Sequence, residues 1–221
     1  MKIPMSILAI VALALAAMYL LAPAPNPEMI KARTDLPWQI SVNADGSSRV
    51  FDLELGTATL SEAQQKFGPV INYAVFVRDQ DHSDLEAYFG DVLFGPLKAK
   101  VVVKLAAGEA EKQALVARGG ERKASPTGDW KHIINKADHA AQAQRRVTAI
   151  SYIPSTRGLD EAFFLERFGK PVATLFENKE AVSWFYPEQG LSVLIDNQSH
   201  EVLEYVPPRD FKMPGGVTPY Q

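Results

Sequence analysis

The stretch Leu159-Asp-Glu-Ala-Phe-Phe-Leu-Glu-Arg-Phe-Gly-Lys-Pro171 decides the expected fold, because an earlier stretch, Leu60-Ser-Glu-Ala-Gln-Gln-Lys-Phe-Gly-Pro69, has the same pattern. Each stretch predicts a short capped helix that ends at a Phe-Gly pair. A meander of strands is expected after each helix. Two explanations of the match are open: a true duplication, or chance recurrence of helix, stop and strand signals.

The strands around these helices are predicted from alternating apolar and polar residues. A hairpin is expected from 38–42 and 49–53, across the turn residues 43–46. Further strands are expected over 72–77, 85–94, 97–105, 130–134, 147–153, 173–177, 181–186, 191–195 and 201–206, and further helices over 109–118 and 137–145. The predicted fold class is α+β: antiparallel sheet or sheets with helices packed on one face, in two similar helix-then-strands units at about 57–105 and 155–206.

The composition is that of a folded protein and excludes several functional classes. Of the 221 residues, 47% are hydrophobic and 22% are charged, and the net charge is −3. A nucleic-acid partner is not expected, because the chain has no basic stripe with interleaved aromatic residues. The chain has no cysteine, which excludes thiolate catalysis, zinc–cysteine sites, disulfides and a lipid tether on cysteine.

The N-terminal segment 3–22 carries no charge and has the length needed to cross a bilayer, so it predicts one transmembrane anchor. Two alternatives are a cleaved signal peptide, suggested by Ala22-Pro-Ala24, and a buried core helix. The length of the apolar run and Pro25 after the cleavage pattern favour a retained anchor. The residues expected to contact lipid are Ile7, Leu8, Ile10, Val11, Leu13, Leu15, Tyr19 and Leu20.

The remainder is expected to form a proline-rich spacer at 23–36, a soluble α+β domain at 37–212 and a flexible tail at 213–221. Lysine and arginine counts on the two flanks of the anchor nearly tie. Export signals begin with a basic residue before an apolar run, and Lys2 has this position here. We therefore expect a single-pass protein of the inner (cytoplasmic) membrane with its soluble domain in the periplasm.

Residues with catalytic or metal-binding chemistry do not form a known arrangement. The four histidines, His82, His132, His139 and His200, lack metal-ligand spacing. No Gly-x-Ser-x-Gly elbow occurs, and the carboxylates at 79–84 and 177–180 lie in predicted polar turns. No catalytic residue, cofactor or metal is therefore predicted.

The strand 182–186 is the most suggestive stretch for binding, because aromatic residues occupy both of its faces. Trp184 and Tyr186 share one face and Phe185 lies on the other. Aromatic anchors are typical of binding surfaces, and the candidate partner-binding residues are Trp184, Tyr186 and Tyr205. The alternative is that these residues belong to the core.

The pattern Leu-Asp-Glu-Ala…Arg-Phe-Gly-Lys-Pro over 159–171, followed by antiparallel strands, is similar to the repeat of β-lactamase-inhibitor-like proteins. It also resembles small outer-membrane assembly lipoproteins of the SmpA/OmlA type, and the whole chain resembles uncharacterised membrane-anchored proteobacterial proteins. The resemblance covers about 57–105 and 155–206. It implies a binding module that grips partners with an aromatic sheet surface. The chain departs from these groups in lacking lipidated or disulfide-bonded cysteines and in keeping an anchor.

Together these features predict a membrane-anchored extracytoplasmic interaction module, an accessory or assembly subunit of an envelope complex. Its expected partners are membrane lipid, through the anchor, and another membrane or envelope protein. The alternatives are an enzyme acting on an envelope substrate and an inhibitor of an extracytoplasmic enzyme.

Overall fold

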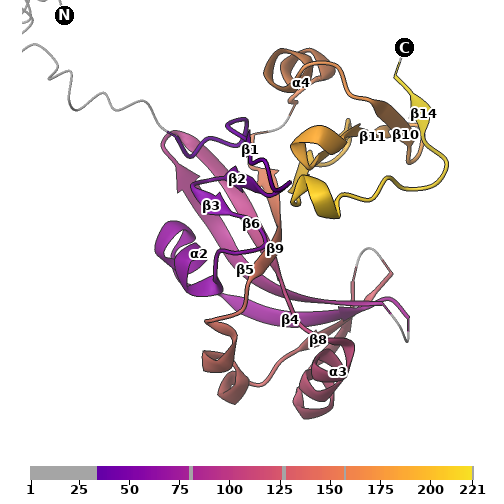
Figure 1. Ribbon diagram of the computed structural model, residues 1–221. Helices are drawn as coiled ribbons and strands as arrows, with labels where there is room; N and C mark the ends of the chain where they lie inside the picture. The colour runs from indigo at the N-terminus through magenta and orange to yellow at the C-terminus, as the bar shows by residue number, and fades with distance from the viewer. Residues whose placement is uncertain (1–33, 80–81, 126–127, 157, 221) are drawn as a thin grey trace, which may run out of the picture. The chain divides into compact units, whose positions relative to one another are not determined.

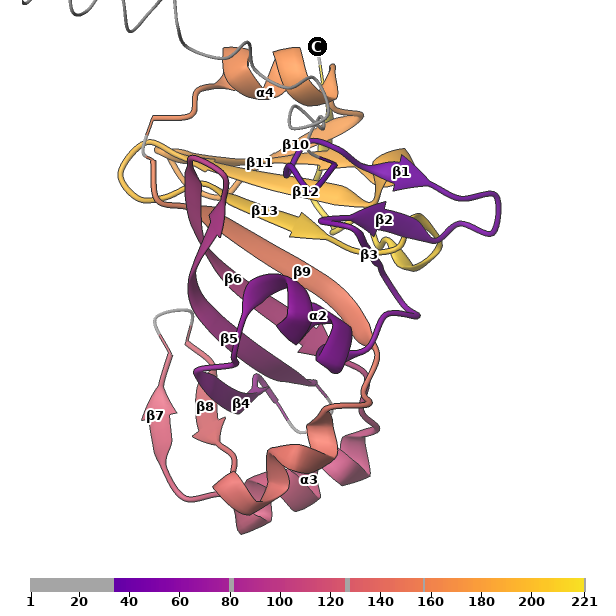
Figure 2. The same cartoon turned by 90° about the vertical axis from the view of Figure 1, so that its left-hand side faces the viewer.

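An antiparallel sheet of eleven strands is the frame of the described part of the chain (Figure 2). The computed structural model describes residues 34–79, 82–125, 128–156 and 158–220. Across the sheet the strand order is β14-β10-β11-β12-β13-β9-β6-β5-β4-β8-β7. In chain order the strands are β4 (Asn72–Val77), β5 (Ser83–Phe94), β6 (Leu97–Leu105), β7 (Arg122–Ala124), β8 (Trp130–Ile133), β9 (Val147–Pro154), β10 (Ala173–Phe176), β11 (Ala181–Tyr186), β12 (Leu191–Asp196), β13 (Val202–Tyr205) and β14 (Thr218–Pro219).

A small second sheet precedes the first helix and consists of β1 (Ser41–Val42), β2 (Ser48–Val50) and β3 (Leu53–Glu54). Strands β2 and β3 are joined by only two residues, Phe51 and Asp52, and both have positive φ angles, 54° and 61°. A two-residue hairpin turn requires such angles because they match the twist of the flanking strands. Glycine or asparagine normally occupies these positions, so this turn is strained.

Three α-helices are described: α2 (Leu60–Phe67), α3 (Glu109–Arg118) and α4 (Glu161–Phe168). Helix α2 begins with a capping box, in which Glu62 N donates to Thr59 Oγ1 at 3.3 Å and Thr59 N donates to Glu62 Oε2 at 2.7 Å. Asp160 caps α4 in a similar way. The glycines Gly68 and Gly169 have positive φ and end α2 and α4 after about two turns.

The core lies on one face of the large sheet and includes buried side chains from all three helices, which Figure 1 labels. Alternate strand residues point to this face, such as Val101 and Val103 on β6 and Leu191 and Val193 on β12. Phe51 is at the centre of the core, and its ring lies 4.9–5.9 Å from the rings of Phe67, Phe94, Tyr152 and Tyr205.

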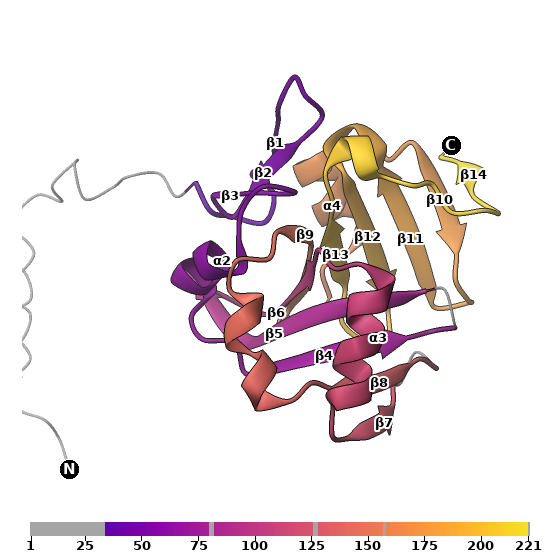
Figure 3. The same cartoon turned by 60° about the horizontal axis from the view of Figure 1, so that its bottom comes forward.

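Strand β9 joins the two halves of the sheet, because it pairs with β6 on one side and with β13 on the other. Strands β4 to β6 and strands β10 to β13 would otherwise be separate meanders. The two halves run in clearly different directions (Figure 3), so the sheet bends where β9 connects them. The strands that follow the two stretches with matching sequence therefore belong to one continuous sheet.

The predicted α+β class is wrong: the described chain is mainly antiparallel β-structure in one eleven-stranded sheet. The helices are too short to form a layer comparable to the sheet, since glycine ends two of them early. The segment expected to be a helix at 137–145 instead forms two short 3₁₀ helices, η2 (Lys136–Asp138) and η3 (Ala140–Gln142). There the Gln142 side chain donates to the carbonyl of Asp138, and the Arg145 side chain donates to the carbonyl of Ala106.

Two further expectations concern the ends of the chain. The predicted anchor at 3–22 lies outside the described residues, and none of the helices from Thr34 onward is long and apolar enough to span a membrane. The tail, expected to be flexible, contains β14, which pairs with β10. Two more 3₁₀ helices, η4 (Pro187–Gln189) and η5 (Pro208–Asp210), connect the C-terminal strands.

Candidate functional site

The three aromatic residues predicted to bind a partner lie in the core. Trp184, Tyr186 and Tyr205 are only 2%, 3% and 1% exposed. Their strand face is the one that α4 covers, and the Tyr186 hydroxyl donates to the carbonyl of Gly169 at the end of that helix at 3.2 Å. The prediction of a partner-binding role is corrected to a structural role, because a buried ring has no surface to offer a partner.

The opposite face of the large sheet, here called the open face, carries side chains that the described helices leave uncovered. Strand register places one row of residues across β4, β5, β6, β9, β13 and β12 on this face: Asn72, Tyr88, Val102, Ser151, Glu204 and Ser192. All six side chains are half-buried. Half-exposed aromatic and aliphatic groups beside polar ones are typical of protein-binding surfaces.

A cluster of charged residues lies in the middle of the open face. Glu86 on β5 is directly opposite Lys104 on β6. Lys104 Nζ lies 2.9 Å from Glu204 Oε1 on β13 and 3.6 Å from Asp84 Oδ2 on β5. These four residues, Asp84, Glu86, Lys104 and Glu204, are called the charge cluster below.

The bond from Lys104 to Glu204 crosses β9, and small side chains on that strand permit it. Lys104 pairs with Ala149, and Glu204 pairs with Ser151, both on β9. Because neither side chain is large, the lysine can extend over the strand to the carboxylate. The ion pair therefore connects the two halves of the bent sheet on the face opposite the core.

Burial changes the protonation of the charge cluster. Burial raises the pKa of Glu86 to about 7, although the Lys104 ammonium acts in the opposite direction. Burial also acts to lower the pKa of Lys104, but the nearby carboxylates of Glu204, Asp84 and Glu86 outweigh it, so this pKa is raised. The cluster therefore gains a negative charge near neutral pH, when Glu86 ionises.

We expect Glu86→Gln to stabilise the protein above pH 7 and to flatten its stability between about pH 4.5 and 7. In that window the native state of the unsubstituted chain binds more protons than the unfolded chain, so its stability falls as the pH rises. The gain above pH 7 should be about 1–2 kcal/mol, discounted for the partial exposure of the side chain. Urea unfolding at pH 5, 6, 7 and 8 measures this gain. The control is Glu121→Gln, at an exposed position just before β7. If the stability of Glu86→Gln and of the unsubstituted chain changes in parallel with pH, the prediction is contradicted.

Next to the charge cluster the open face has a shallow hollow of about 170 Å³. Its lining includes Phe76, Tyr88 and Val102 as the apolar part and Glu86 and Lys131 as the charged part. The ammonium of Lys131 lies 5.6 Å from the centre of the Phe76 ring. The hollow is large enough for one or two side chains of a partner.

The four histidines lie in separate places. The exposed His82 ring lies 2.8 Å from an Asp79 oxygen, and the His139 ring packs 4.5 Å from that of Tyr73. His132 is on β8, where burial and the Arg122 guanidinium lower its pKa. Within the described ranges, no group of three or more His, Asp or Glu side chains is arranged to hold a metal ion.

Sequence reasoning did not single out the residues of the open face. The signal was present, since apolar residues alternate with charged or polar ones from Leu85 to Tyr88 and, except at Val102, from Lys98 to Lys104. Alternation shows which residues share a face, but the two faces of an isolated strand look equivalent. Only the pairing of β6 with β9, and of β9 with β13, brings Lys104 and Glu204 together.

Comparison with known proteins gives no family. No protein-family model matches the chain. No curated protein and no solved structure matches it either.

Proposed function

We propose that this chain is a membrane-anchored interaction module whose open face binds another envelope protein, as an accessory or assembly subunit. In this proposal the segment 3–22 is the membrane anchor, in the inner membrane, and the folded domain lies in the periplasm. The observation that carries the proposal is the open face itself. Its row of half-buried residues runs from β4 to β12 on the face opposite the core, and its centre combines the half-exposed rings of Phe76 and Tyr88 with the charge cluster.

The chemistry of the open face supports protein binding. Aromatic side chains such as Tyr88 gain most from burial at an interface and lose little conformational entropy. The cluster supplies charges that a partner can match, which gives specificity more than affinity. A bent sheet also presents residues from both halves to one partner, because Tyr88 and Glu204 lie in one row.

The test is site-specific photo-crosslinking of the full chain in cells, with the photoreactive residue at position 88 or, as control, at position 93. Leu93 is 70% exposed and shares the open face with Tyr88, but it lies near the tip of the β5–β6 hairpin, outside the charge cluster and the hollow. We expect position 88 to give one defined adduct, identified by mass spectrometry, and position 93 not to give it. A crosslink that forms equally well at both positions would argue against the centre of the open face as the binding site.

The matching binding prediction is that Tyr88→Arg weakens the affinity for the crosslinked partner by about tenfold or more, since it puts an unpaired charge into the interface. Leu93→Arg should leave the affinity unchanged. Pull-down of purified partner over a concentration series measures both values. Equal affinities for the two variants would refute this proposal.

A further inference from the structure

A groove on the helix-covered side of the sheet is distinct from the open face. It lies between the start of α4 and the β10–β11 hairpin and consists of two adjoining hollows of about 630 and 340 Å³. The hollows share Glu161, Phe176 and Val182. Each is within the range of about 300–1,000 Å³ that is usual for ligand sites.

The floor of this groove is apolar and partly open to solvent. Phe176 is 75% exposed, which is unusual for a phenylalanine on a strand. Val182 is half-buried beside it, and strand register pairs these two residues across β10 and β11. Val182 packs against the edge of the core, whereas Phe176 is left uncovered.

The chain's own C-terminal segment occupies one end of the groove. The Tyr220 ring packs edge-on against that of Trp184, with 5.5 Å between the ring centres. Tyr220 N donates to the carbonyl of Val172 at 3.3 Å, so the segment lies extended along β10. This arrangement shows which kind of group fits the groove: an extended backbone carrying a large apolar side chain.

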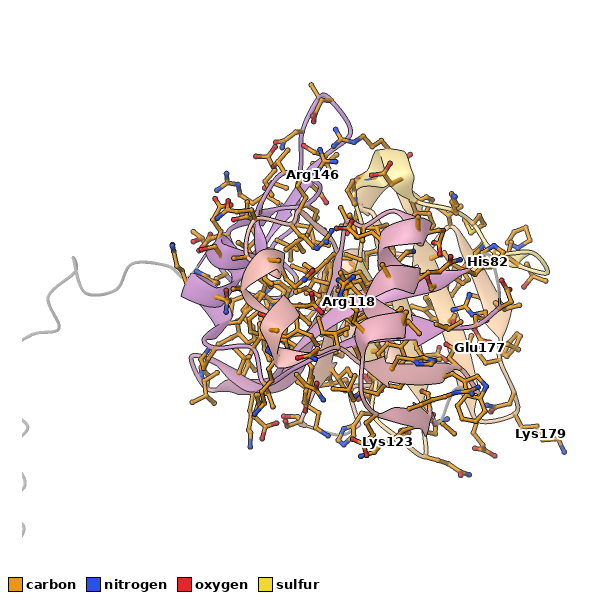
Figure 4. The ribbon with its side chains drawn as sticks, turned by 90° about the horizontal axis from the view of Figure 1, so that it is seen from below. His82, Arg118, Lys123, Arg146, Glu177 and Lys179 are labelled. Atoms are coloured by element: carbon orange, nitrogen blue, oxygen red, sulfur yellow. The ribbon has the colours of Figure 1, made fainter. Side chains whose placement is uncertain are left out.

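The rim of the groove is acidic. Glu161 and Glu180 are exposed and form no ion pair with any described residue. Asp160 lies beside them, and its carboxylate caps α4. The single lysine in the lining, Lys179, lies at the outer margin of the molecule in Figure 4. A ligand with positive charge next to its apolar group therefore complements the site.

We infer that this groove binds an extended segment of a protein partner in which a large apolar side chain is flanked by lysine or arginine. The apolar side chain covers Phe176 and Val182, continuing the row that Tyr220 begins on Trp184. The flanking cations face Glu161 and Glu180. This inference does not depend on the open face, since the residues belong to the other side of the sheet.

The test uses the full chain in zwitterionic nanodiscs and a blocked, dye-labelled peptide of sequence Gly-Lys-Val-Phe-Val-Lys-Gly, with fluorescence anisotropy as the readout. Two control peptides replace the phenylalanine by serine or both lysines by glutamate, and empty nanodiscs report binding to lipid. We expect saturable binding with a Kd of about 10–500 µM, in keeping with a small interface. We expect neither control peptide to bind at these concentrations.

Variants of the chain separate the groove from other exposed apolar residues. Phe176→Ser should weaken binding at least about fivefold, while Leu93→Ser, at a similarly exposed position outside the groove, should not change it. The double variant Glu161→Gln, Glu180→Gln should weaken binding about three- to tenfold and reduce its salt dependence. All these side chains are exposed, so the variants should keep the melting temperature.

Three results would each overturn the inference. The first is absence of binding to the lysine peptide, and the second is equal binding of the lysine and glutamate peptides. The third is equal affinity of Phe176→Ser and the unsubstituted chain.

Discussion

Replacing Phe51 by alanine should destabilise the folded domain by about 3–5 kcal/mol, the cost usual for removing a buried aromatic ring. Phe51 is 0% exposed and contacts four other aromatic rings from α2, β5, β9 and β13. Removing it leaves a cavity where the small sheet, a helix and both halves of the large sheet meet. Chemical unfolding followed by far-ultraviolet circular dichroism measures the loss.

The backbone at Phe51 permits a control that separates packing from strain. Its φ of 54° is unfavourable for any residue with a Cβ, whereas glycine adopts it freely. Phe51→Gly removes the same ring but also removes the strain, so it should be about 1 kcal/mol more stable than Phe51→Ala. If alanine at this position costs less than about 1 kcal/mol, the ring is not the centre of the core that its contacts indicate.

The second large effect is expected for Lys104→Met, which should destabilise the protein by about 2–4 kcal/mol at pH 8. The substitution keeps most of the unbranched side chain but leaves the carboxylates of Asp84, Glu86 and Glu204 together without their cation. The cost should shrink at pH 5, where Glu86 is protonated in the folded protein because its pKa is raised to about 7.

A double-mutant cycle tests whether the charge cluster acts as a unit. In the background of Glu86→Gln, the cost of Lys104→Met should fall by about 1 kcal/mol or more, because one of the unpaired charges is already absent. Lys100→Met is a suitable control, since Lys100 is an exposed lysine on the same strand. Strict additivity of the two substitutions would show that Glu86 and Lys104 do not interact.

Local features of the fold could be predicted from sequence because short-range interactions decide them. The caps Thr59 and Asp160 and the stops Gly68 and Gly169 define α2 and α4 through contacts within a few residues. The β2–β3 turn could not be predicted, because Phe51-Asp52 lacks the Asn-Gly type of signal. The contacts of the Phe51 ring with distant residues hold this turn, and local sequence patterns cannot predict such contacts.

The architecture and the candidate site depend on pairings between distant parts of the chain. Strand β9 reads from sequence as an ordinary alternating strand, yet its pairing with both β6 and β13 makes one sheet from two meanders. The same pairing decides which face is open, so Trp184 and Tyr186 are buried while Tyr88 and Lys104 are not. Alternation in the sequence shows which residues lie on the same face of a strand, but it does not show which of the two faces the helices cover.

The hydrogen bond from the buried hydroxyl of Tyr205 to the carbonyl of Pro37, at 2.8 Å, has a mechanical consequence. It connects the first described residues directly to β13, in the interior of the sheet, and Trp38 next to it packs against Phe163 of α4. A pulling force applied at Thr34 would therefore act on β13, an interior strand of the large sheet, and through Trp38 on α4. At this end the domain should therefore resist tension through contacts in its interior and not through an edge strand.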